Sequence, residues 1–180
     1  MASPVRQNFH SDSEAALNQL INLKLSASYT YLSLAFYFDR DDIALPNFSR
    51  FFRTRSESER QQADKLLGYQ NERGGRVLLQ TAGELSIKPK PSQDEWGSGL
   101  FALSACLQLQ RGLNQSLLSL HSTASTHSDA HITDFLEGHF LTDSVDFLKT
   151  LGDHIASLSH ITSCQPKSMM GEYLFDKHSL

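Results

Sequence analysis

Cysteine is scarce in this chain, and several other patterns are missing from it. The two cysteines, Cys106 and Cys164, lie far apart, so they form neither a zinc motif nor a disulfide framework, and they fit a reducing compartment. No run of about 18 apolar residues is present, so we expect no membrane-spanning helix. The net charge of -4 gives no basic footprint for nucleic acid. Residues 1–10 lack an apolar run of signal-peptide length, and we expect a cytosolic protein.

Helical periodicity is the dominant signal that is present, and no strand-period pattern competes with it. Ser11 and Ser92 each open a capping box, Pro46 suits a first helical turn, and Gly74 with Gly75 is a strong C-terminal signal. These marks predict one all-α domain over 1–180, with helices at about 11–40, 46–73, 93–121, 129–159 and 168–178. The long connection over 76–91 predicts that the second and third helices run parallel. The sequence therefore indicates a four-helix bundle with a long crossover and a short fifth helix.

Polar residues interrupt the apolar stripe near the middle of each long helix. They are predicted to meet in one layer of the bundle: Lys24, Glu59, Gln62, Gln110 and Ser144. A buried charge costs several kcal/mol unless it is paired, so this layer requires a physical explanation.

Two explanations compete for this layer. Di-iron bundles use a Glu from each of two helices and Glu-x-x-His pairs from the other two, but here Glu59 is followed by Gln62 and one carboxylate cannot neutralise two iron ions. In the other explanation Lys24 replaces the metal as the positive partner of Glu59, and the neutral side chains complete the hydrogen bonds. We favour this second explanation because it uses every polar group in the layer.

Seven ordered segments resemble animal ferritins, and together they extend over essentially the whole chain. They are QNFH at 7–10, ASYTYLSL at 27–34, FYFDRDD at 36–42, QNERGGR at 70–76, NQSLL at 114–118, DFLE at 134–137 and GEYLFDK at 171–177. The resemblance implies the ferritin-like four-helix bundle, in agreement with the periodicity. It also implies a hollow cage of twenty-four subunits, of one or more kinds, that stores iron as a ferric mineral and needs no organic cofactor.

The resemblance also assigns family roles to the polar layer. In the iron-oxidising heavy subunit, Glu stands at the position of Lys24, His at Gln62, Glu at Gln110 and Gln at Ser144, so that only Glu59 matches. Tyr31, which lies beside that centre in the family motif, is present. The resemblance therefore implies that this chain lacks the family's ferroxidase activity and resembles the light subunit, which fills the centre with a salt bridge.

Other family sites are better preserved. Asp134 and Glu137 match acids that line the threefold channel for iron, and His121 and His131 match histidines near it, while Thr133 stands where cysteine is frequent. A ring of such acids from three subunits would attract cations. For the two histidines, ordinary surface contacts are an equal alternative. For the acids, an ordinary helix surface is the weaker alternative.

Two further groups have family counterparts. Glu57 and Asp64 correspond to a possible mineral-binding inner surface, and solvated helix surface explains them as well. Met170, Leu174 and His178 share one face of the last helix and correspond to residues on the fourfold axis, where packing against the bundle is the alternative. The segment 81–93 is longer than the usual connection, which predicts altered dimer contacts.

Three functions remain open from the sequence. The first is a catalytically silent shell subunit for iron storage that co-assembles with active subunits. The second is a weak or relocated ferroxidase that uses Glu59, Glu57 and Asp64. The third is a cage or bundle that binds partners and has no role in iron storage.

Overall fold

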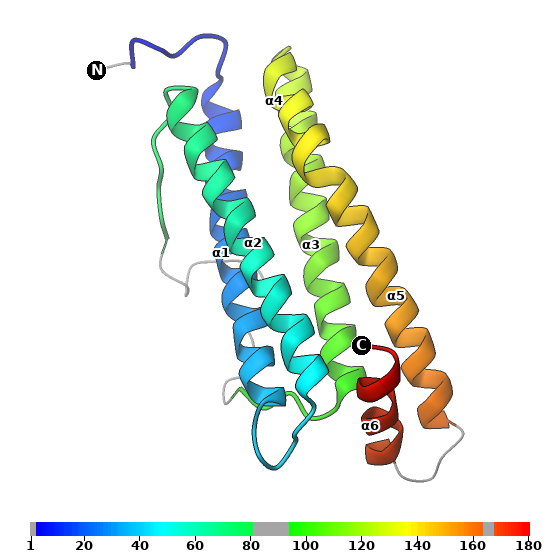
Figure 1. The fold of residues 1–180 in the computed structure, drawn as a ribbon. Helices are drawn as coiled ribbons and strands as arrows, with labels where there is room; N and C mark the ends of the chain where they lie inside the picture. The colour runs from blue at the N-terminus through cyan, green and yellow to red at the C-terminus, as the bar shows by residue number, and fades with distance from the viewer. Residues whose placement is uncertain (1–2, 81–93, 164–167) are drawn as a thin grey trace.

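The computed structural model describes residues 3–80, 94–163 and 168–180. Over these residues the order is α1 (Ser11–Phe38), α2 (Pro46–Glu72), α3 (Gly99–Thr126), α4 (Ala130–Leu136), the π-helix η1 (Glu137–Leu141), α5 (Thr142–Ser163) and α6 (Ser168–His178). α4, η1 and α5 form one continuous rod, so the bundle has four long rods (Figure 1). α2 and α3 run in the same direction, as the long crossover predicted, and α6 lies across the end where they begin. The predicted all-α four-helix bundle with a short C-terminal helix is confirmed over these residues.

The first and third helices differ from the prediction at their starts or ends. α1 ends at Phe38 rather than near 40, and its N-cap is His10, whose Nδ1 accepts a hydrogen bond from the backbone N–H of Asp12. α3 begins at Gly99 rather than near 93, because Gly97 has a φ of 67° that a helix cannot continue through. Ser98 then caps the helix by accepting from the N–H of Phe101.

The third helix was predicted to end at about residue 121, where a polar run begins, and this prediction is wrong. α3 continues to Thr126. Its Ser and Thr hydroxyls hydrogen-bond to the carbonyl four residues earlier, as Thr123 does to Ser119 and Thr126 to Ser122. This back-bonding satisfies the hydroxyls within the helix, so the segment remains helical. The break lies at residues 127–129 instead.

The fourth predicted helix, 129–159, is longer and is interrupted. It ends at Ser163, and five of its residues, Glu137–Leu141, form a π-helix. π-helical turns are rare and occur frequently at functional sites. Phe140 in this turn is buried, as are Leu136 and Ser144 four residues to either side of it, so the apolar spacing did not indicate the turn.

The crossover begins by running along α1. Asn18 and Asn22, one turn apart and buried, exchange hydrogen bonds with the backbone of Arg76, Leu78 and Gln80 at 2.8 to 3.0 Å. These amides replace the strand partner that an extended segment otherwise needs. The predicted extra length at 81–93 lies outside the described residues, as does Cys164.

α6 is fixed to the bundle by carboxylates at two helix N-termini. Asp176 is fully buried and accepts from the N–H groups of Asn47 and Phe48 in the first turn of α2. Glu172 accepts from the N–H of Gly99 at the start of α3. Carboxylates are favoured at such positions, so α6 caps both helices from outside them.

The buried apolar residues form two clusters, one toward each end of the bundle. On α2 the first cluster reaches Phe52 and the second begins at Leu66. On the last long rod, Phe140 belongs to the second cluster and Leu151 to the first. On these two rods the predicted polar residues Glu59, Gln62 and Ser144 lie between these limits. Lys24 and Gln110 lie beside members of the first cluster, Leu23 on α1 and Leu113 on α3. The polar layer therefore lies where the two apolar clusters meet.

Candidate functional site

An ion-pair network occupies the middle of the bundle. The Lys24 ammonium donates to Glu59 Oε2 and to Gln62 Oε1, both at 2.7 Å. Lys24 is 1% exposed and Glu59 is fully buried. The ion pair predicted from the sequence is therefore present, and it joins α1 to α2 across the bundle. Burial lowers the pKa of Lys24, and its contact with Glu59 partly offsets this effect.

Arg55 supplies a second cation, which the sequence reasoning missed. Its Nη2 lies 2.5 Å from Glu59 Oε1, one helical turn away on α2. Its Nη1 donates to Asp143 at 3.1 Å, and its guanidinium lies 3.8 Å from the centre of the Phe147 ring. Burial lowers the pKa of Arg55, but the neighbouring carboxylates of Glu59 and Asp143 outweigh burial and raise it. The signal available in the sequence was the four-residue spacing of Arg55 and Glu59.

Asp143 is the second anion, and it was missed as well. It accepts from Gln62 Nε2 at 2.8 Å in addition to Arg55. The network therefore contains two cations, Lys24 and Arg55, and two anions, Glu59 and Asp143. Its formal charge is zero, and three of its four charged side chains are at most 6% exposed.

The other two predicted members of the layer have different partners. Gln110 accepts from the hydroxyl of Tyr31 at 3.3 Å, and Ser144 donates to Asn114 at 3.0 Å. Neither completes the hydrogen bonding of Lys24 and Glu59, so this part of the prediction is corrected. Tyr31 is fully buried, and burial raises its pKa well above the ordinary value. These contacts link α1 to α3 and α3 to α5 beside the ion pairs.

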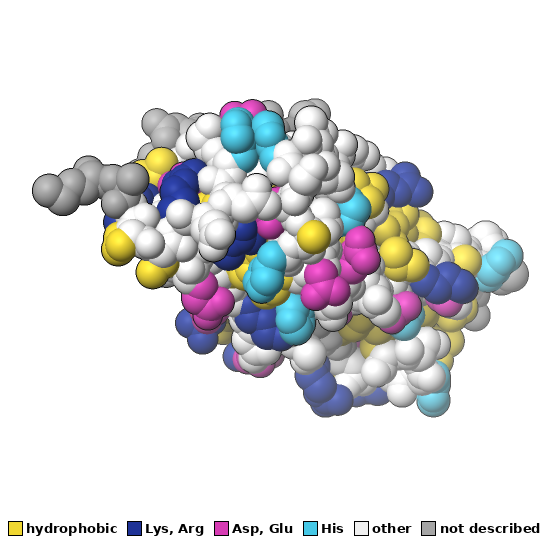
Figure 2. Space-filling view, turned by 90° about the horizontal axis from the view of Figure 1, so that it is seen from above, with side chains coloured by type: hydrophobic (Ala, Val, Ile, Leu, Met, Phe, Trp, Pro, Cys, Tyr) yellow, Lys and Arg dark blue, Asp and Glu magenta, His cyan; other side chains and the backbone are white. Residues whose placement is uncertain are grey.

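The acids predicted for a channel lie on the exposed surface of α4 and η1. Asp134 and Glu137 are both exposed, and Glu137 pairs with His121 of α3 at 2.7 Å. His131 is instead hydrogen-bonded to the hydroxyl of Tyr69 at 2.9 Å. The structure thus brings three of the four predicted residues to one face and directs His131 toward α2. Figure 2 looks onto this end of the bundle and shows acidic and histidine side chains interspersed there.

The remaining predicted residues occupy two other surfaces. Glu57 and Asp64 are both exposed on α2. Met170 and His178 are exposed on α6, and Leu174 is partly exposed between them. No described helix has the combination of length and apolar character that a bilayer span requires.

Among the described residues, an oxidation centre for iron has few usable ligands. Glu59 already contacts two protein cations, and Gln62 presents an amide where imidazole would bind iron better. A metal ion in this layer would have to displace the Lys24 ammonium. The arrangement is suited to holding α1, α2 and α5 together by charge pairing.

Comparisons with known proteins agree with this architecture. The family described as "Ferritin-like domain" matches residues 14–161. The chain is 54% identical to "Ferritin, middle subunit" of Salmo salar, over 100% of this chain and 98% of that protein. It is also 54% identical to "Ferritin, lower subunit" of Aquarana catesbeiana, over 100% and 99%. The chain belongs to the ferritin family.

Proposed function

We propose that this chain is a subunit of an iron-storage ferritin cage and that its own centre does not oxidise iron. Its family membership and its relatives' names as ferritin subunits support the first part. One observation carries the second part: the Lys24 ammonium lies 2.7 Å from both Glu59 Oε2 and Gln62 Oε1. A cation fixed by two buried oxygens occupies the position where iron would need ligands.

Electrostatics supports the same conclusion. Two ferrous ions bring four positive charges, and carboxylates must compensate them at a buried site. Here the two carboxylates are already compensated by Lys24 and Arg55. Repulsion between a cation of the protein and a divalent ion at about 4 Å amounts to several kcal/mol at an intermediate dielectric constant. The charge-neutral layer therefore opposes iron binding.

The proposed role is that of a light-subunit-like shell component in the cytosol. Glu57 and Asp64 are exposed on α2 and have carboxylates that suit hard iron ions, so we assign them to a weak mineral-contacting surface. Oxidation would then be supplied by co-assembled subunits with an intact centre. The chain would contribute the shell, the mineral space and a route for ions.

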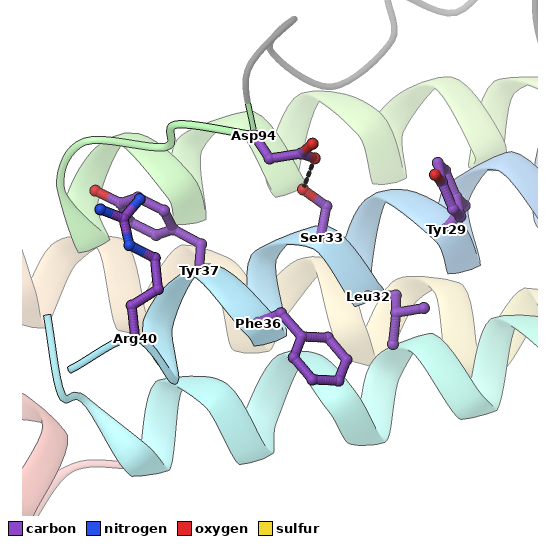
Figure 3. Close-up of a pocket in the computed structure, with 7 residues that line it drawn as sticks. All are labelled: Tyr29, Leu32, Ser33, Phe36, Tyr37, Arg40 and Asp94. Atoms are coloured by element: carbon purple, nitrogen blue, oxygen red, sulfur yellow. Dashed lines mark hydrogen bonds between the residues drawn. The ribbon is translucent and has the colours of Figure 1, made fainter. Parts of the chain in front are cut away.

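Exposed apolar side chains support assembly into a cage. Tyr29, Leu32 and Phe36 are 61%, 38% and 53% exposed on α1, and they line a hollow with Arg40 and Asp94 (Figure 3). A contiguous apolar surface of this kind marks a contact with another protein. We propose that a second subunit covers it.

α6 provides a second proposed contact. Its side chains Met170 and Tyr173 are 56% and 52% exposed, while Phe175 on its opposite face is fully buried against the bundle. The helix is thus packed on one face and apolar on the other. We propose that Met170, Leu174 and His178 meet their counterparts around the fourfold axis.

Asp134 and Glu137 form the proposed route for iron. Both carboxylates are exposed, so they can meet those of two neighbouring subunits, and such a ring lowers the energy of a cation inside it. His121 holds Glu137 through its 2.7 Å contact and would act as a positioning residue. His131 is assigned to packing through Tyr69 rather than to the channel.

Stopped-flow oxidation of ferrous iron by the pure homopolymer tests the proposal. We expect a rate equal to that of a protein-free control at the same pH and oxygen concentration. A faster rate would favour the weak or relocated ferroxidase instead. Iron loading of cages mixed with active subunits tests storage itself. If these mixed cages store no mineral, a partner-binding cage without a role in iron storage becomes the better explanation.

A further inference from the structure

A cluster of potential metal ligands lies outside the ion-pair layer and apart from the channel acids. His10 and Asp12 stand at the start of α1, and His127 is the C-cap of α3. One ligand atom from each lies within 4.8 Å of those from the other two. We propose that His10, Asp12 and His127 form a surface site for a divalent transition-metal ion of the zinc class.

The distances within this cluster match those around a small metal ion. His10 Nδ1 and His127 Nε2 each lie 3.4 Å from Asp12 Oδ2. Zinc bonds to nitrogen and oxygen at about 2.0–2.2 Å, so two ligand atoms of a tetrahedral site are separated by about 3.3–3.6 Å. Two edges of the site therefore already have the required length. Water would complete the coordination on the exposed side.

The donor set selects the kind of ion. Two imidazoles and one carboxylate suit zinc, copper and ferrous iron, whereas calcium and magnesium prefer oxygen ligands alone. A neutral imidazole is required, and His10 accepts a hydrogen bond at Nδ1 from the N–H of Asp12, which places a lone pair on that nitrogen. A metal ion at Nδ1 would replace this hydrogen bond.

The two imidazoles need one adjustment. Their rings are stacked, with centroids 3.6 Å apart and planes 12° apart. A metal ion lies in the plane of each imidazole that binds it, so one ring must turn. The side chain of His10 is 44% exposed and has room for this rotation, while His127 is 29% exposed and held more closely. His10 is therefore the movable ligand.

The backbone on both sides of the cluster is held in place. The Asn8 amide donates to the carbonyl of Ser128 at 3.2 Å, which ties the residues before α1 to those after α3. Arg73, the C-cap of α2, donates to the carbonyl of Asn8 at 3.1 Å and to Asp129 at 2.8 Å. A site whose supporting chain is fixed loses less entropy when an ion binds.

The helix dipoles at the cluster oppose each other. The N-terminus of α1 carries a positive partial charge, which disfavours a cation. The C-terminus of α3, where His127 lies, carries a negative partial charge that favours one. The carboxylate of Asp12 then gives the site a net attraction for a divalent ion. Histidine and acidic side chains are visible together on this end of the molecule in Figure 2.

Calorimetric titration with Zn²⁺ tests the site in the assembled protein. The titrated protein carries Asp134→Asn and Glu137→Gln, so that the channel acids do not compete. We expect one Zn²⁺ per subunit to bind at this cluster. His127→Asn should weaken its binding at least tenfold, because even the loss of a residue that only supports a metal ligand typically costs about tenfold or more in affinity. His160→Asn, on the exposed surface of α5, is the matched control and should leave binding unchanged. Equal binding with and without His127 would overturn the proposal.

A second measurement needs no substitution in the cluster. Diethyl pyrocarbonate modifies accessible neutral imidazoles, and mass spectrometry locates the modified residues. We expect Zn²⁺ to protect His10 and His127 at least several-fold while His160 remains equally reactive. Protection of all three to the same extent, or of none, would show that the cluster holds no metal ion.

Discussion

The centre of the bundle and the exposed face of α4 and η1 present the same carboxylate group in two environments. In the centre, Glu59 is fully buried and contacts both Lys24 and Arg55. On the exposed face, Asp134 is surrounded by solvent, and Glu137, 60% exposed, has a single histidine partner. Buried charges must be compensated within the protein, while water compensates the exposed ones. The first arrangement stabilises the bundle by charge pairing, and the second is the one that our proposal assigns to a passing cation.

The largest effect should follow from removing the buried anion. Glu59→Gln leaves Lys24 and Arg55 without their shared partner. Breaking a buried ion pair from one side costs about 3–5 kcal/mol. For a chain of this length we expect the thermal midpoint of the assembled protein to fall by about 10 °C. Scanning calorimetry measures the shift.

The matched control is Glu57→Gln, which changes an exposed carboxylate two residues away on α2. Its midpoint should stay within about 2 °C of the unsubstituted protein, since substitutions on an exposed surface are usually nearly neutral. Equal losses in the two variants would mean that the centre does not depend on charge pairing.

The sequence alone predicted the helices and the ion pair between Lys24 and Glu59, because both depend on local signals. Apolar spacing marks a helix, and a lysine among buried positions requires an anion at the same level of the bundle. Arg55 and Asp143 were missed for a different reason. Each lies at the edge of its stripe, and only the three-dimensional packing of α2 against α5 decides that Arg55 turns inward.

The sequence also did not indicate the π-helix or the cluster of His10, Asp12 and His127. A π-turn adds one residue to a helical turn, and this change depends on tertiary packing rather than on residue type. His10 and His127 are separated by most of the chain, and each resembles an ordinary polar helix end. Their stacking becomes visible only when α1 and α3 are placed side by side.

The next effect concerns the gain of iron oxidation. Lys24→Glu, Gln62→His and Gln110→Glu introduce three of the four residues that the resemblance assigns to an iron-oxidising centre, but Arg55 would still neutralise Glu59. Adding Arg55→Gln should therefore raise the initial rate of ferrous oxidation at least tenfold over the variant that retains Arg55. A tenfold change requires about 1.4 kcal/mol, well below the repulsion that one cation exerts at this distance.

Stopped-flow absorbance under oxygen measures both rates. Gel filtration must first establish that both variants assemble. If Arg55→Gln does not raise the rate of ferrous oxidation in correctly assembled protein, Arg55 is not the residue that keeps iron from this centre.

A smaller effect is expected at the exposed acids. Asp134→Asn with Glu137→Gln should slow the passage of divalent ions into the assembled cage roughly tenfold, the lower limit of electrostatic steering. A metal-quenched fluorophore trapped inside the cage reports the rate. The difference from the unsubstituted protein should shrink as salt is added, because mobile ions screen exposed charges. A difference that is independent of salt would assign these residues to the shape of the route instead of to its charge.

The smallest effect should come from the exposed ion pair itself. His121→Gln removes the histidine partner of Glu137. The side chain of His121 is 31% exposed and that of Glu137 is 60% exposed. An ion pair in contact with water contributes under about 1 kcal/mol, so we expect the thermal midpoint to move by no more than about 2–4 °C. Ion passage, measured with the trapped fluorophore, should change less than when the acids themselves are replaced, since both carboxylates remain. A loss of stability as large as that of Glu59→Gln would place this pair in the same category as the buried centre, because only a desolvated charge carries so large a cost when its partner is removed.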